Sequence, residues 1–492
     1  MRSIVEAHAP VIRPIRTVQF GEGNFLRAFV GDLWQSANDH GIPLGNIAVV
    51  KPRVSPETDD PLAKFRAQNG VYTVLRRGRM DGTVVDEAKI IDCVAEFLYP
   101  DRDRARVREI FRSPELFYVV SNTTEAGIAL SAEDSIDTLA KSYPAKLTQL
   151  LYDRFTTFSG DPARGLTILP MELIEHNGTT LRECVLEMAC YWELPAGFAA
   201  WIRKSCVFVN TLVDRIVTGK PHDHDMELIW HTLGYRDEAV AVCEPFFSLV
   251  LEDKAGVATL KPLQDAGLSV TVTDDLARYR ERKVRILNGA HTGNVLCGIL
   301  AGIPIVHDLV EHPDFGAFFA DMLREEILPY VPVDPADPDG VRRFADSVRD
   351  RFDNPYIDHR LLDISIESAE KWRVRILPSL HDAYRATGKL PLRLTFSFAA
   401  LLAFLTGVET DGAVMGTRAD GSTYPIRDTH AAEFLAICHL PAAEYVRRAV
   451  GMRELWGCDL AAYPCFVETV SEMLTDIRKD PVEAVRKWSV RS

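Results

Sequence analysis

One short stretch near the start of the chain constrains the fold more than any other. Residues 16–20 form a mostly apolar run of strand length, and Gly21-Glu22-Gly23 follow it directly. Apolar residues then recur with helical spacing from Phe25 to Trp34, and residues 46–50 form a second strand-like run. The order strand, glycine turn, helix, strand is typical of the first part of a nucleotide-binding α/β domain.

The two parts of the chain differ in their hydrophobic patterns. Apolar runs at 116–120 and 166–169 are typical of buried parallel strands, and they alternate with helical stretches at 145–156 and 181–193. After about residue 275 helical periodicity dominates, at 283–301, 315–328, 341–351, 361–376, 394–406, 430–440 and 466–478. We therefore expect an α/β fold in which a Rossmann-type doubly wound sheet domain, residues 1–275, is followed by a mostly α-helical C-terminal domain, residues 276–492. The stretches 329–339 and 407–422 are expected to be surface loops.

Composition narrows the classes of partner. The 492 residues include 56 basic and 70 acidic side chains, a net charge of −14, which argues against nucleic acid or an anionic membrane as the main partner. The nine cysteines are scattered without Cys-x-x-Cys spacing, as free thiols in a reducing compartment would be. No signal-like stretch or long apolar run is present, so we expect a cytoplasmic protein with no membrane partner. The oligomeric state stays open.

The glycine turn predicts a dinucleotide cofactor. Gly21 and Gly23 would let the backbone turn tightly and approach a pyrophosphate, which the following helix N-terminus attracts. Leu26 stands where the usual third glycine would be, so a plain strand-to-helix turn remains the alternative. The second strand ends at Lys51-Pro-Arg53 without an acidic residue for the ribose hydroxyls, and the choice between NAD and NADP is open.

A second group of polar residues lies in the run from Lys283 to His291. On a helix that turns about 100° per residue, Asn288 lies roughly 140° and His291 roughly 80° around the axis from Lys283, so the three can share one wall of a site. A partly desolvated amine exchanges protons, while an amide and an imidazole can hold an oxygen whose charge changes. The alternative is a solvated lysine and a core histidine. The basic residues 280, 282 and 285 nearby suit an anionic small substrate or a solvated helix face.

Two other chemistries find little support. His222-Asp-His-Asp225 could be a metal cluster, but alternating residues after a Gly-Lys-Pro turn are more typical of a solvated loop, and we expect no metal. The Gly-x-Ser-x-Gly pattern of a serine hydrolase is absent from the sequence.

These stretches and several others resemble the long-chain, metal-independent polyol dehydrogenases, which include mannitol dehydrogenases and hexuronate reductases. The matching stretches occur in order along nearly the whole chain: Val18–Phe29, Ser121–Gly127, Ser142–Leu147, Thr211–Val217, Lys283–His291, Asn354–Ile357 and Arg393–Phe396.

The resemblance implies a role for each matching residue. Lys283 would be the general acid and base, Asn288 would polarise the carbonyl, and His291 would orient the substrate. The cofactor would lie near Val18, Gln19, Phe20, Gly21, Glu22, Gly23, Asn24, Phe25, Leu26, Arg27, Ala28, Phe29, Thr124, Glu125 and Asp214. Lys371 matches a substrate-binding lysine.

Two departures from the polyol dehydrogenases point to a different substrate. Leu173 occupies the place of a second amide donor, for which Asn177 or Glu172 is the expected substitute. Asp363 replaces a substrate-binding arginine, with His359 and Arg360 nearby as the expected substrate ligands.

The implied activity is reversible hydride transfer between NAD, or NADP, and a hexuronate, with tagaturonate and altronate as the expected pair. Fructuronate or a polyol such as mannitol is the alternative substrate. A more remote alternative is a nucleotide-sensing protein without catalysis, which would not need Lys283, Asn288 and His291 together.

Overall fold

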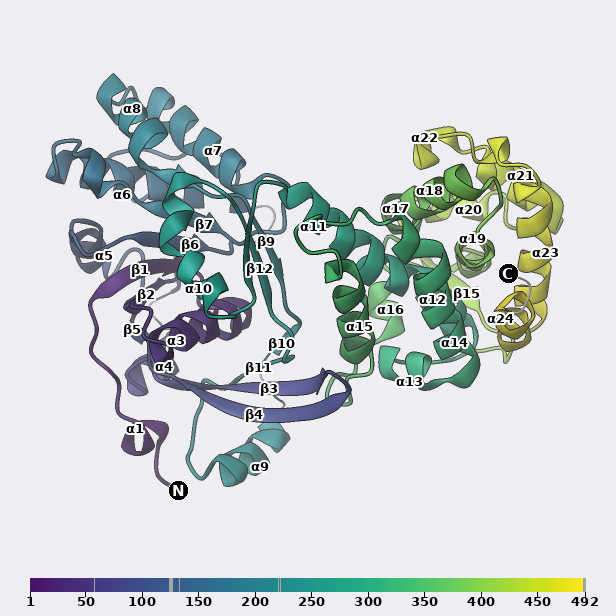
Figure 1. The fold of residues 1–492 in the computed structure, drawn as a ribbon, viewed down its shortest axis with the longest axis horizontal. Helices are drawn as coiled ribbons and strands as arrows, with labels where there is room; N and C mark the ends of the chain where they lie inside the picture. Colours follow the sequence, from purple (N-terminus) through teal and green to yellow (C-terminus); the bar gives the residue numbers. More distant parts are fainter. Residues whose placement is uncertain (57, 124–126, 132, 220, 222, 490–492) are drawn as a thin grey trace. The chain divides into compact units, whose positions relative to one another are not determined.

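The computed structural model describes all residues except 57, 124–126, 132, 220, 222 and 490–492, and the side chains of 223, 224 and 255 are also left undescribed. The chain forms two compact units (Figure 1). The first contains residues 1–77 and 84–276, and the second contains residues 78–83 and 277–492. The main division lies within two residues of the boundary expected from the sequence, whereas the short segment 78–83 was not expected in the second unit.

A six-stranded parallel sheet forms the centre of the first unit. Its strands are β1 (Ile15–Phe20), β2 (Asn46–Val50), β5 (Val94–Leu98), β6 (Tyr118–Ser121), β7 (Thr167–Pro170) and β8 (Val207–Phe208). They lie in the order β5-β2-β1-β6-β7-β8, and every neighbouring pair is parallel. The chain order reverses between β1 and β6, where open α/β sheets bind ligands beyond the carboxyl ends of their strands. The doubly wound sheet predicted from the sequence is confirmed.

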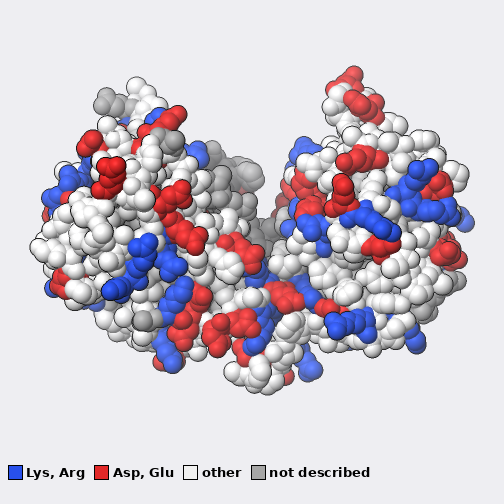
Figure 2. All heavy atoms as spheres, turned by 90° about the horizontal axis from the view of Figure 1, so that it is seen from above, with Lys and Arg blue, Asp and Glu red and all other residues white. Residues whose placement is uncertain are grey.

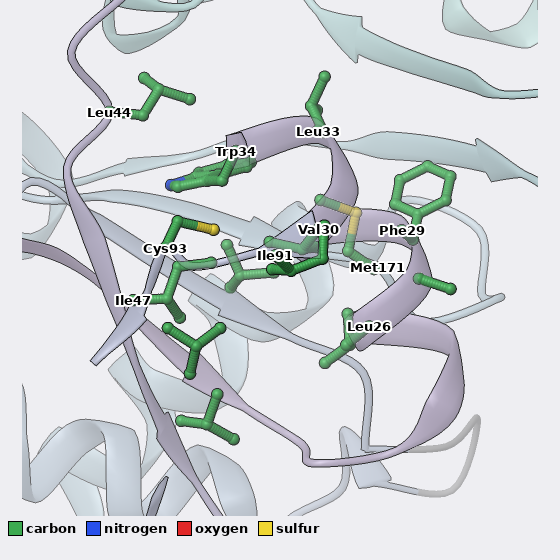
Figure 3. Close-up of a cluster of buried hydrophobic side chains, with 14 of the residues drawn as sticks. Leu26, Phe29, Val30, Leu33, Trp34, Leu44, Ile47, Ile91, Cys93 and Met171 are labelled. Atoms are coloured by element: carbon green, nitrogen blue, oxygen red, sulfur yellow. The ribbon is translucent and has the colours of Figure 1, made fainter. Parts of the chain in front are cut away.

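Two apolar cores cover the faces of this sheet. Phe20 and Val50 pack with helices α5 (Arg104–Phe111), α6 (Tyr143–Thr157), α7 (Asn177–Tyr191) and α8 (Ala196–Ser205). The other face packs against the helical segment formed by α2 (Asn24–Leu26), the π-helix η1 (Arg27–Gly31) and α3 (Asp32–Asp39). Figure 3 shows this second core, where Trp34 lies near Cys93 and Phe29 lies on the side of Met171. The apolar spacing noted after the glycine turn is therefore the buried side of this segment.

Two smaller sheets in the first unit were not expected from the sequence. One has the order β10-β11-β3-β4 and the other β13-β12-β9. Their strands are β3 (Tyr72–Met80), β4 (Thr83–Ile91), β9 (Thr211–Asp214), β10 (Val217–Gly219), β11 (Ala241–Cys243), β12 (Ser248–Glu252) and β13 (Val270–Thr273). The remaining elements are α1 (Ile4–Ala7), α4 (Ala63–Ala67), η3 (Pro162–Arg164), α9 (Asp223–Leu233), η4 (Ala255–Thr259) and α10 (Lys261–Asp265).

A buried carboxylate ties the helical segment after the glycine turn to these strands. Asp32 accepts a hydrogen bond from Arg76 Nε at 3.0 Å and lies 2.6 Å from Arg215 Nη1. Burial alone would raise the pKa of Asp32, but Arg215 and Arg76 together hold it below its ordinary value. Arg215 also donates to the carbonyl of Ala28 at 2.7 Å, so the charges fix the helical segment at two points.

The second unit is helical, as predicted. Helix α12 (Gly289–Leu300) is buried along its whole length and α19 (Leu392–Phe404) is buried from Arg393 onward, and the two pack against each other as the core of this unit. The other helices are α11 (Leu276–Lys283), η5 (Val284–Asn288), α13 (Val306–Glu311), α14 (Pro313–Asp321), η6 (Met322–Ile327), η7 (Leu328–Tyr330), α15 (Gly340–Phe352), α16 (Leu361–Ile364), α17 (Ser368–Arg375), α18 (Leu377–Thr387), α20 (Ala431–Leu435), α21 (Ala442–Val450), α22 (Arg453–Trp456), η8 (Leu460–Ala462), α23 (Phe466–Lys479) and α24 (Pro481–Ser489).

The expectation that residues 407–422 form only a loop was wrong. They contain most of a three-stranded antiparallel sheet formed by β14 (Gly407–Thr410), β15 (Ala413–Thr417) and β16 (Thr423–Pro425). Gly412 has φ +76° in the turn between β14 and β15, so one of the glycines that suggested a loop forms a hairpin turn.

The tip of the β3–β4 hairpin belongs to the second unit. Arg79 Nε lies 2.9 Å from Asp353 Oδ2, and the backbone N–H of Gly82 donates to Asp350 Oδ2 at 3.0 Å. Asp353 also lies 3.0 Å from His307 Nδ1. These contacts hold residues 78–83 on the end of α15.

The surface features agree with the composition. Within the described residues we find no helix that combines the length and the apolar character needed to cross a membrane. On the face drawn in Figure 2, acidic and basic side chains are interspersed over both units, and no extended basic surface is visible there.

We predict that Asp32→Ala destabilises the first unit by about 3 kcal/mol, because removing one partner of a buried charge pair leaves the other uncompensated. Urea unfolding followed by circular dichroism would show this as a lower midpoint. The matched control is Glu444→Ala, which removes an exposed carboxylate paired with Arg447 and Arg448 and should leave the midpoint nearly unchanged. Equal midpoints for the two variants would contradict the prediction.

Candidate active site

The glycine turn at the end of β1 has one position that only glycine can occupy without strain. Gly21 has φ +129°, and a Cβ there would lie 2.8 Å from Leu26 Cδ1 and 3.3 Å from the carbonyl oxygen of Asn122. Its N–H donates to the carbonyl of Val50 at 3.0 Å, which holds the turn at the ends of β1 and β2. Gly21 therefore has a local structural reason to be glycine.

Gly23 lacks such a reason. A Cβ at Gly23 would meet no atom within 4 Å, and Gly23 starts α2 without any side-chain cap. Among the described residues its neighbourhood is open, and the first backbone N–H groups of a continuous helical segment follow it. An open glycine before uncapped N–H groups fits the close approach of a pyrophosphate.

Much of the stretch Val18–Phe29 has a structural role within the protein. Val18, Phe20, Leu26, Ala28 and Phe29 are buried in the two cores of the first unit, so their side chains have a packing role, and their expected contact with a cofactor stays a prediction.

Three more members of the stretch are also engaged internally. Gln19 donates to the carbonyl of Gly21 at 2.7 Å, Arg27 to the carbonyl of Glu22 at 3.3 Å, and Phe25 stacks on Phe29 with ring centres 5.0 Å apart. Asn24 Oδ1 also accepts a hydrogen bond from Arg27, so the backbone from Gly21 to Asn24 remains as the part suited to a ligand.

The other expected cofactor positions lie further along the chain. Thr124 and Glu125 lie outside the described residues. Asp214 is the buried last residue of β9, where it pairs with Ser248. Its cofactor role stays a prediction.

A cavity of about 430 Å³ lies at the carboxyl edge of the parallel sheet. The last residues of β1 and β2, Phe20 and Val50, line it together with Pro100, which follows β5. Helices α5 and α6 supply Arg104, Arg108 and Lys146 to its wall. Cavities beyond the carboxyl ends of parallel strands are where α/β domains bind nucleotides, and this one lies beside the glycine turn.

In the second unit, the expected polar group lies on a helix that changes its winding. Lys283 is the last residue of α11, residues 284–288 form a π-helix that ends at Asn288, and α12 follows. Because π-helical hydrogen bonds join residues five apart, residues i and i+5 lie close on one face. Asn288 is therefore nearer to the face of Lys283 than the expected 140°, and His291 follows three residues later on the α-helix.

Lys283 and Asn288 are half-buried. Within the described part of the chain, the side-chain amide of Asn288 makes no hydrogen bond and can bind a ligand oxygen. The π-helix thus brings together an amine and an amide that can act on the same group, and π-bulges are frequent at functional sites.

His291 lies in a fixed and dry environment. Its ring is 9% exposed and stacks on Phe352, with ring centres 3.9 Å apart and planes inclined by 4°. Its Nε2 is buried and has no hydrogen-bond partner among the described residues. Burial lowers the pKa of His291 well below its usual value, and the nearby His359 adds to the shift. The ring is therefore neutral, oriented, and able to offer one nitrogen to a ligand.

Two of the expected substrate ligands lie near His291, and one does not. The rings of His359 and His291 are 5.5 Å apart, edge to face, and the charge of Lys371 acts on His291. Burial also lowers the pKa of Lys371, whose Nζ donates to the carbonyl of Ile364 at 3.0 Å. Arg360 is exposed at the start of α16 and shows no such contact within the described residues.

Sequence reasoning missed Arg375 and Phe352. Phe352 supports the His291 ring, and Arg375 Nη1 donates to Thr292 Oγ1 at 3.4 Å, one residue beyond His291. Arg375 follows Lys371 by four residues on the same helix, and this spacing on one helix face was an available signal. Phe352 carried no comparable signal because its contact is purely tertiary.

Two of the basic residues near Lys283 are engaged by other side chains of the protein. Arg285 lies 2.6 Å from Glu281 and 2.6 Å from Asp382, so its charge is compensated within the protein. Arg282 lies over the rings of Tyr279 and Phe344. The cations that favour an anionic substrate are therefore Lys371 and Arg375 of α17, and not Arg282 and Arg285.

Asn177, the other expected substrate ligand, is occupied by backbone groups. Its amide nitrogen donates to the carbonyls of Pro170 and Glu172, and its oxygen accepts from the N–H groups of Gly178 and Thr211. The residue is 1% exposed and ties β7 to β9. Its amide therefore has a structural role, and its expected role as a substrate ligand stays a prediction.

Leu173 and Glu172, the neighbours of Asn177, lie in contrasting settings. Leu173 is 62% exposed. Buried Glu172 accepts hydrogen bonds from Ser121 and Thr123.

The possible metal group His222–Asp225 includes a residue and side chains that lie outside the described part of the chain.

Comparisons with known proteins agree with the two-domain fold. The chain matches the model of the mannitol dehydrogenase Rossmann domain over residues 15–264 and that of the mannitol dehydrogenase C-terminal domain over residues 275–478. It is 37% identical to an altronate oxidoreductase of Bacillus subtilis (strain 168), covering 95% of this chain and 93% of that protein. It is 39% identical to an altronate oxidoreductase of Shigella flexneri, covering 96% of each.

Solved structures show the same fold. A Pseudomonas fluorescens mannitol 2-dehydrogenase in a ternary complex with NAD and D-mannitol aligns with a TM-score of 0.66 at 23% identity, covering 96% of this chain and 94% of that one. A D-sorbitol dehydrogenase in substrate-free form aligns with a TM-score of 0.80 at 21% identity, covering 96% and 95%.

The fold and these relatives define an oxidoreductase that acts on CH–OH groups. More particularly, the chain belongs to the mannitol dehydrogenase family, with both of its domains present in the family order.

We predict that the buried His291 makes the stability of the second unit depend on pH. Its folded pKa is lowered, whereas the unfolded ring titrates near 6.5, so the unfolded chain binds the extra proton and stability falls as the pH drops below about 6.5. His291→Gln should reduce the loss of stability between about pH 7.5 and about pH 5.5 by about 1 kcal/mol.

Urea midpoints at the two pH values would measure this effect. The control His176→Gln changes an exposed histidine and should keep the pH dependence of the unmodified chain. If His291→Gln also kept it, the assignment of a buried neutral ring would be wrong.

Proposed function

We propose that this protein interconverts tagaturonate and altronate, with Lys283 as the general acid and base. The observation that carries the proposal is the π-helix that presents Lys283 and Asn288 on one face, followed at once by the oriented, neutral ring of His291. Amine, amide and imidazole together are suited to a carbonyl that becomes a hydroxyl.

Each of the three side chains has its own role toward the substrate. In reduction, Lys283 gives a proton to the oxygen of the forming hydroxyl, and in oxidation it takes that proton back. Asn288 donates a hydrogen bond to the same oxygen, which stabilises the negative charge that develops there. His291 is held by Phe352 and uses Nε2 to orient the substrate.

The segment Gly21–Asn24 would hold the pyrophosphate of a nicotinamide dinucleotide. When bound, the nicotinamide supplies the hydride in reduction and accepts it in oxidation. The open Gly23 and the uncapped helix start offer backbone N–H groups to phosphate oxygens. The cavity beside Val50 suits the adenosine part of the same molecule.

We propose NAD as the preferred dinucleotide. Glu22 Oε1 lies 3.7 Å from Lys51 Nζ, so a carboxylate already compensates the lysine that a 2′-phosphate would use. A carboxylate at this edge can also accept hydrogen bonds from ribose hydroxyls.

The substrate assignment is supported by the relatives. Those at 37% and 39% identity over nearly the whole chain are altronate oxidoreductases, whereas the mannitol and sorbitol dehydrogenase structures are only 23% and 21% identical. The exposed Leu173 and Asp363, where the polyol enzymes have polar or basic ligands, also favour a substrate other than mannitol.

We predict that the unmodified protein oxidises NADH with tagaturonate faster than with fructuronate or fructose, and faster with NADH than with NADPH. Lys283→Ala should lower kcat with tagaturonate by about 10² to 10⁴, the usual contribution of a general acid. Absorbance at the nicotinamide band measures both.

The matched control is Lys389→Ala, which removes an exposed lysine and should leave kcat unchanged. Preference for fructuronate or fructose would overturn the substrate, whereas near-normal turnover by Lys283→Ala would overturn the mechanism. NADH binding without turnover of any keto sugar would favour a sensor.

We also predict that Gly21→Ala and Gly23→Ala separate folding from cofactor binding. Gly21→Ala should lower Tm, because its φ and its contact with Leu26 exclude a Cβ. Gly23→Ala should leave Tm unchanged but weaken NADH binding by about tenfold or more, because the methyl group enters the space of the pyrophosphate.

Differential scanning fluorimetry and the fluorescence of bound NADH would measure the two effects. Unchanged NADH affinity in Gly23→Ala would remove the glycine turn from the cofactor site.

A further inference from the structure

Arg375 is a half-buried cation that has no acidic partner among the described residues. Among the residues that the structure describes, no Asp or Glu forms an ion pair with its guanidinium, and its one side-chain hydrogen bond is the long contact of 3.4 Å to Thr292. Burial lowers the pKa of Arg375, and no nearby carboxylate among the described residues opposes this effect. Uncompensated charges in dry surroundings are costly for a protein unless a ligand uses them.

Other arginines of this chain, two of them buried, are satisfied in ways that Arg375 is not. Arg154 donates to the backbone carbonyls of Phe111, Ser113, Leu116 and Arg164. Arg285 is paired with two carboxylates. Arg373, two residues before Arg375, is paired with Glu370. Arg375 thus differs from each of these three arginines in lacking such partners within the described part of the chain.

The backbone around Arg375 is held close to the catalytic helix. A Cβ placed on Gly289 would lie 3.2 Å from the carbonyl oxygen of Arg375, so the end of α17 packs directly on the start of α12. Gly289 immediately follows Asn288, and Thr292, which accepts the hydrogen bond from Arg375, immediately follows His291. The guanidinium is thus anchored beside the residues that act on the substrate.

A second cation shares this position. Lys371 lies one helical turn before Arg375, and the two charges act on each other and on His291. The Nε2 of His291, which has no hydrogen-bond partner among the described residues, adds a polar atom that is also ready for a ligand. Two positive charges beside a neutral imidazole match an anion better than a neutral polyol hydroxyl.

We propose that Arg375 binds the carboxylate of the sugar-acid substrate and selects sugar acids over neutral sugars. The planar guanidinium can donate two parallel hydrogen bonds to a carboxylate, and Lys371 adds a point charge. A neutral sugar leaves the charge of Arg375 without a carboxylate partner among the described residues, whereas Glu367 and Asp428 already act on Lys371. This inference rests on the proposed function, because it concerns the substrate acted on by Lys283.

The test compares Arg375→Gln and Arg375→Lys with the unmodified enzyme, using tagaturonate and the neutral ketose tagatose with NADH. Arg375→Gln should raise KM for tagaturonate by roughly tenfold to a hundredfold, the value of a charge-assisted hydrogen bond pair, while kcat falls much less. Its kcat/KM for tagatose should stay within about threefold of the unmodified enzyme or rise. Arg375→Lys should keep the charge but lose the bidentate geometry, and show an intermediate KM.

The matched control is Arg373→Gln on the same helix, which should leave KM for both sugars unchanged because Arg373 is paired with Glu370. A change of less than about threefold in KM for tagaturonate in Arg375→Gln would overturn the inference, as would equal losses for the acid and the neutral sugar. A loss of kcat without a change in KM would also overturn it.

A folding defect in Arg375→Gln would show as a lower Tm. In that case Arg375→Lys decides, and an unchanged KM for tagaturonate in this variant would contradict the proposal. If the unmodified enzyme does not reduce tagaturonate, the proposed function itself fails, and this result is distinct from all the others.

Discussion

The close approach of two helices at Gly289 is the contact on which the candidate site of the second unit depends. A side chain at this position would meet the carbonyl oxygen of Arg375 at 3.2 Å, and at Gly293, one turn later, it would meet Met322 Sδ and Cε at 2.8 Å. The absence of both side chains lets α12 be enclosed by its neighbours along its whole length. His291 and Thr292 are carried on this enclosed helix and Asn288 directly precedes it, so their positions are set by the core and not by a mobile loop.

The main features of the fold could be predicted because they are local. The apolar runs of β1 and β2 and the glycine turn between strand and helix are each visible within a few neighbouring residues. The strands β14 to β16 were missed because their glycine-rich sequence looks like a loop until the strands pair. The π-helix was missed for a related reason, since a change of winding leaves no simple periodic pattern.

The same distinction explains what could be predicted of the site. Lys283, Asn288 and His291 lie in one short run, so helical geometry alone was enough to relate them to one another. Asn177 has the right residue type for a substrate ligand, but only the fold shows that backbone groups of β7 and β9 already use its amide. Arg285 and Arg375 look alike in the sequence, yet Glu281 and Asp382 neutralise the first, and no described carboxylate neutralises the second. Glu281 is a helical neighbour of Arg285, but Asp382 comes from a distant part of the chain.

The hairpin tip at residues 78–83 makes the second unit discontinuous along the chain. Gly82 and its partner Asp350 are separated by 268 residues, so this part of the unit is synthesised long before the helix that receives it. A fragment that contains only residues 277–492 would lack Arg79, and Asp353 would lose this cationic partner. Asp353 directly follows Phe352, the residue that supports the His291 ring. The helical unit therefore takes part of its structure from a six-residue tip that is encoded within the first unit.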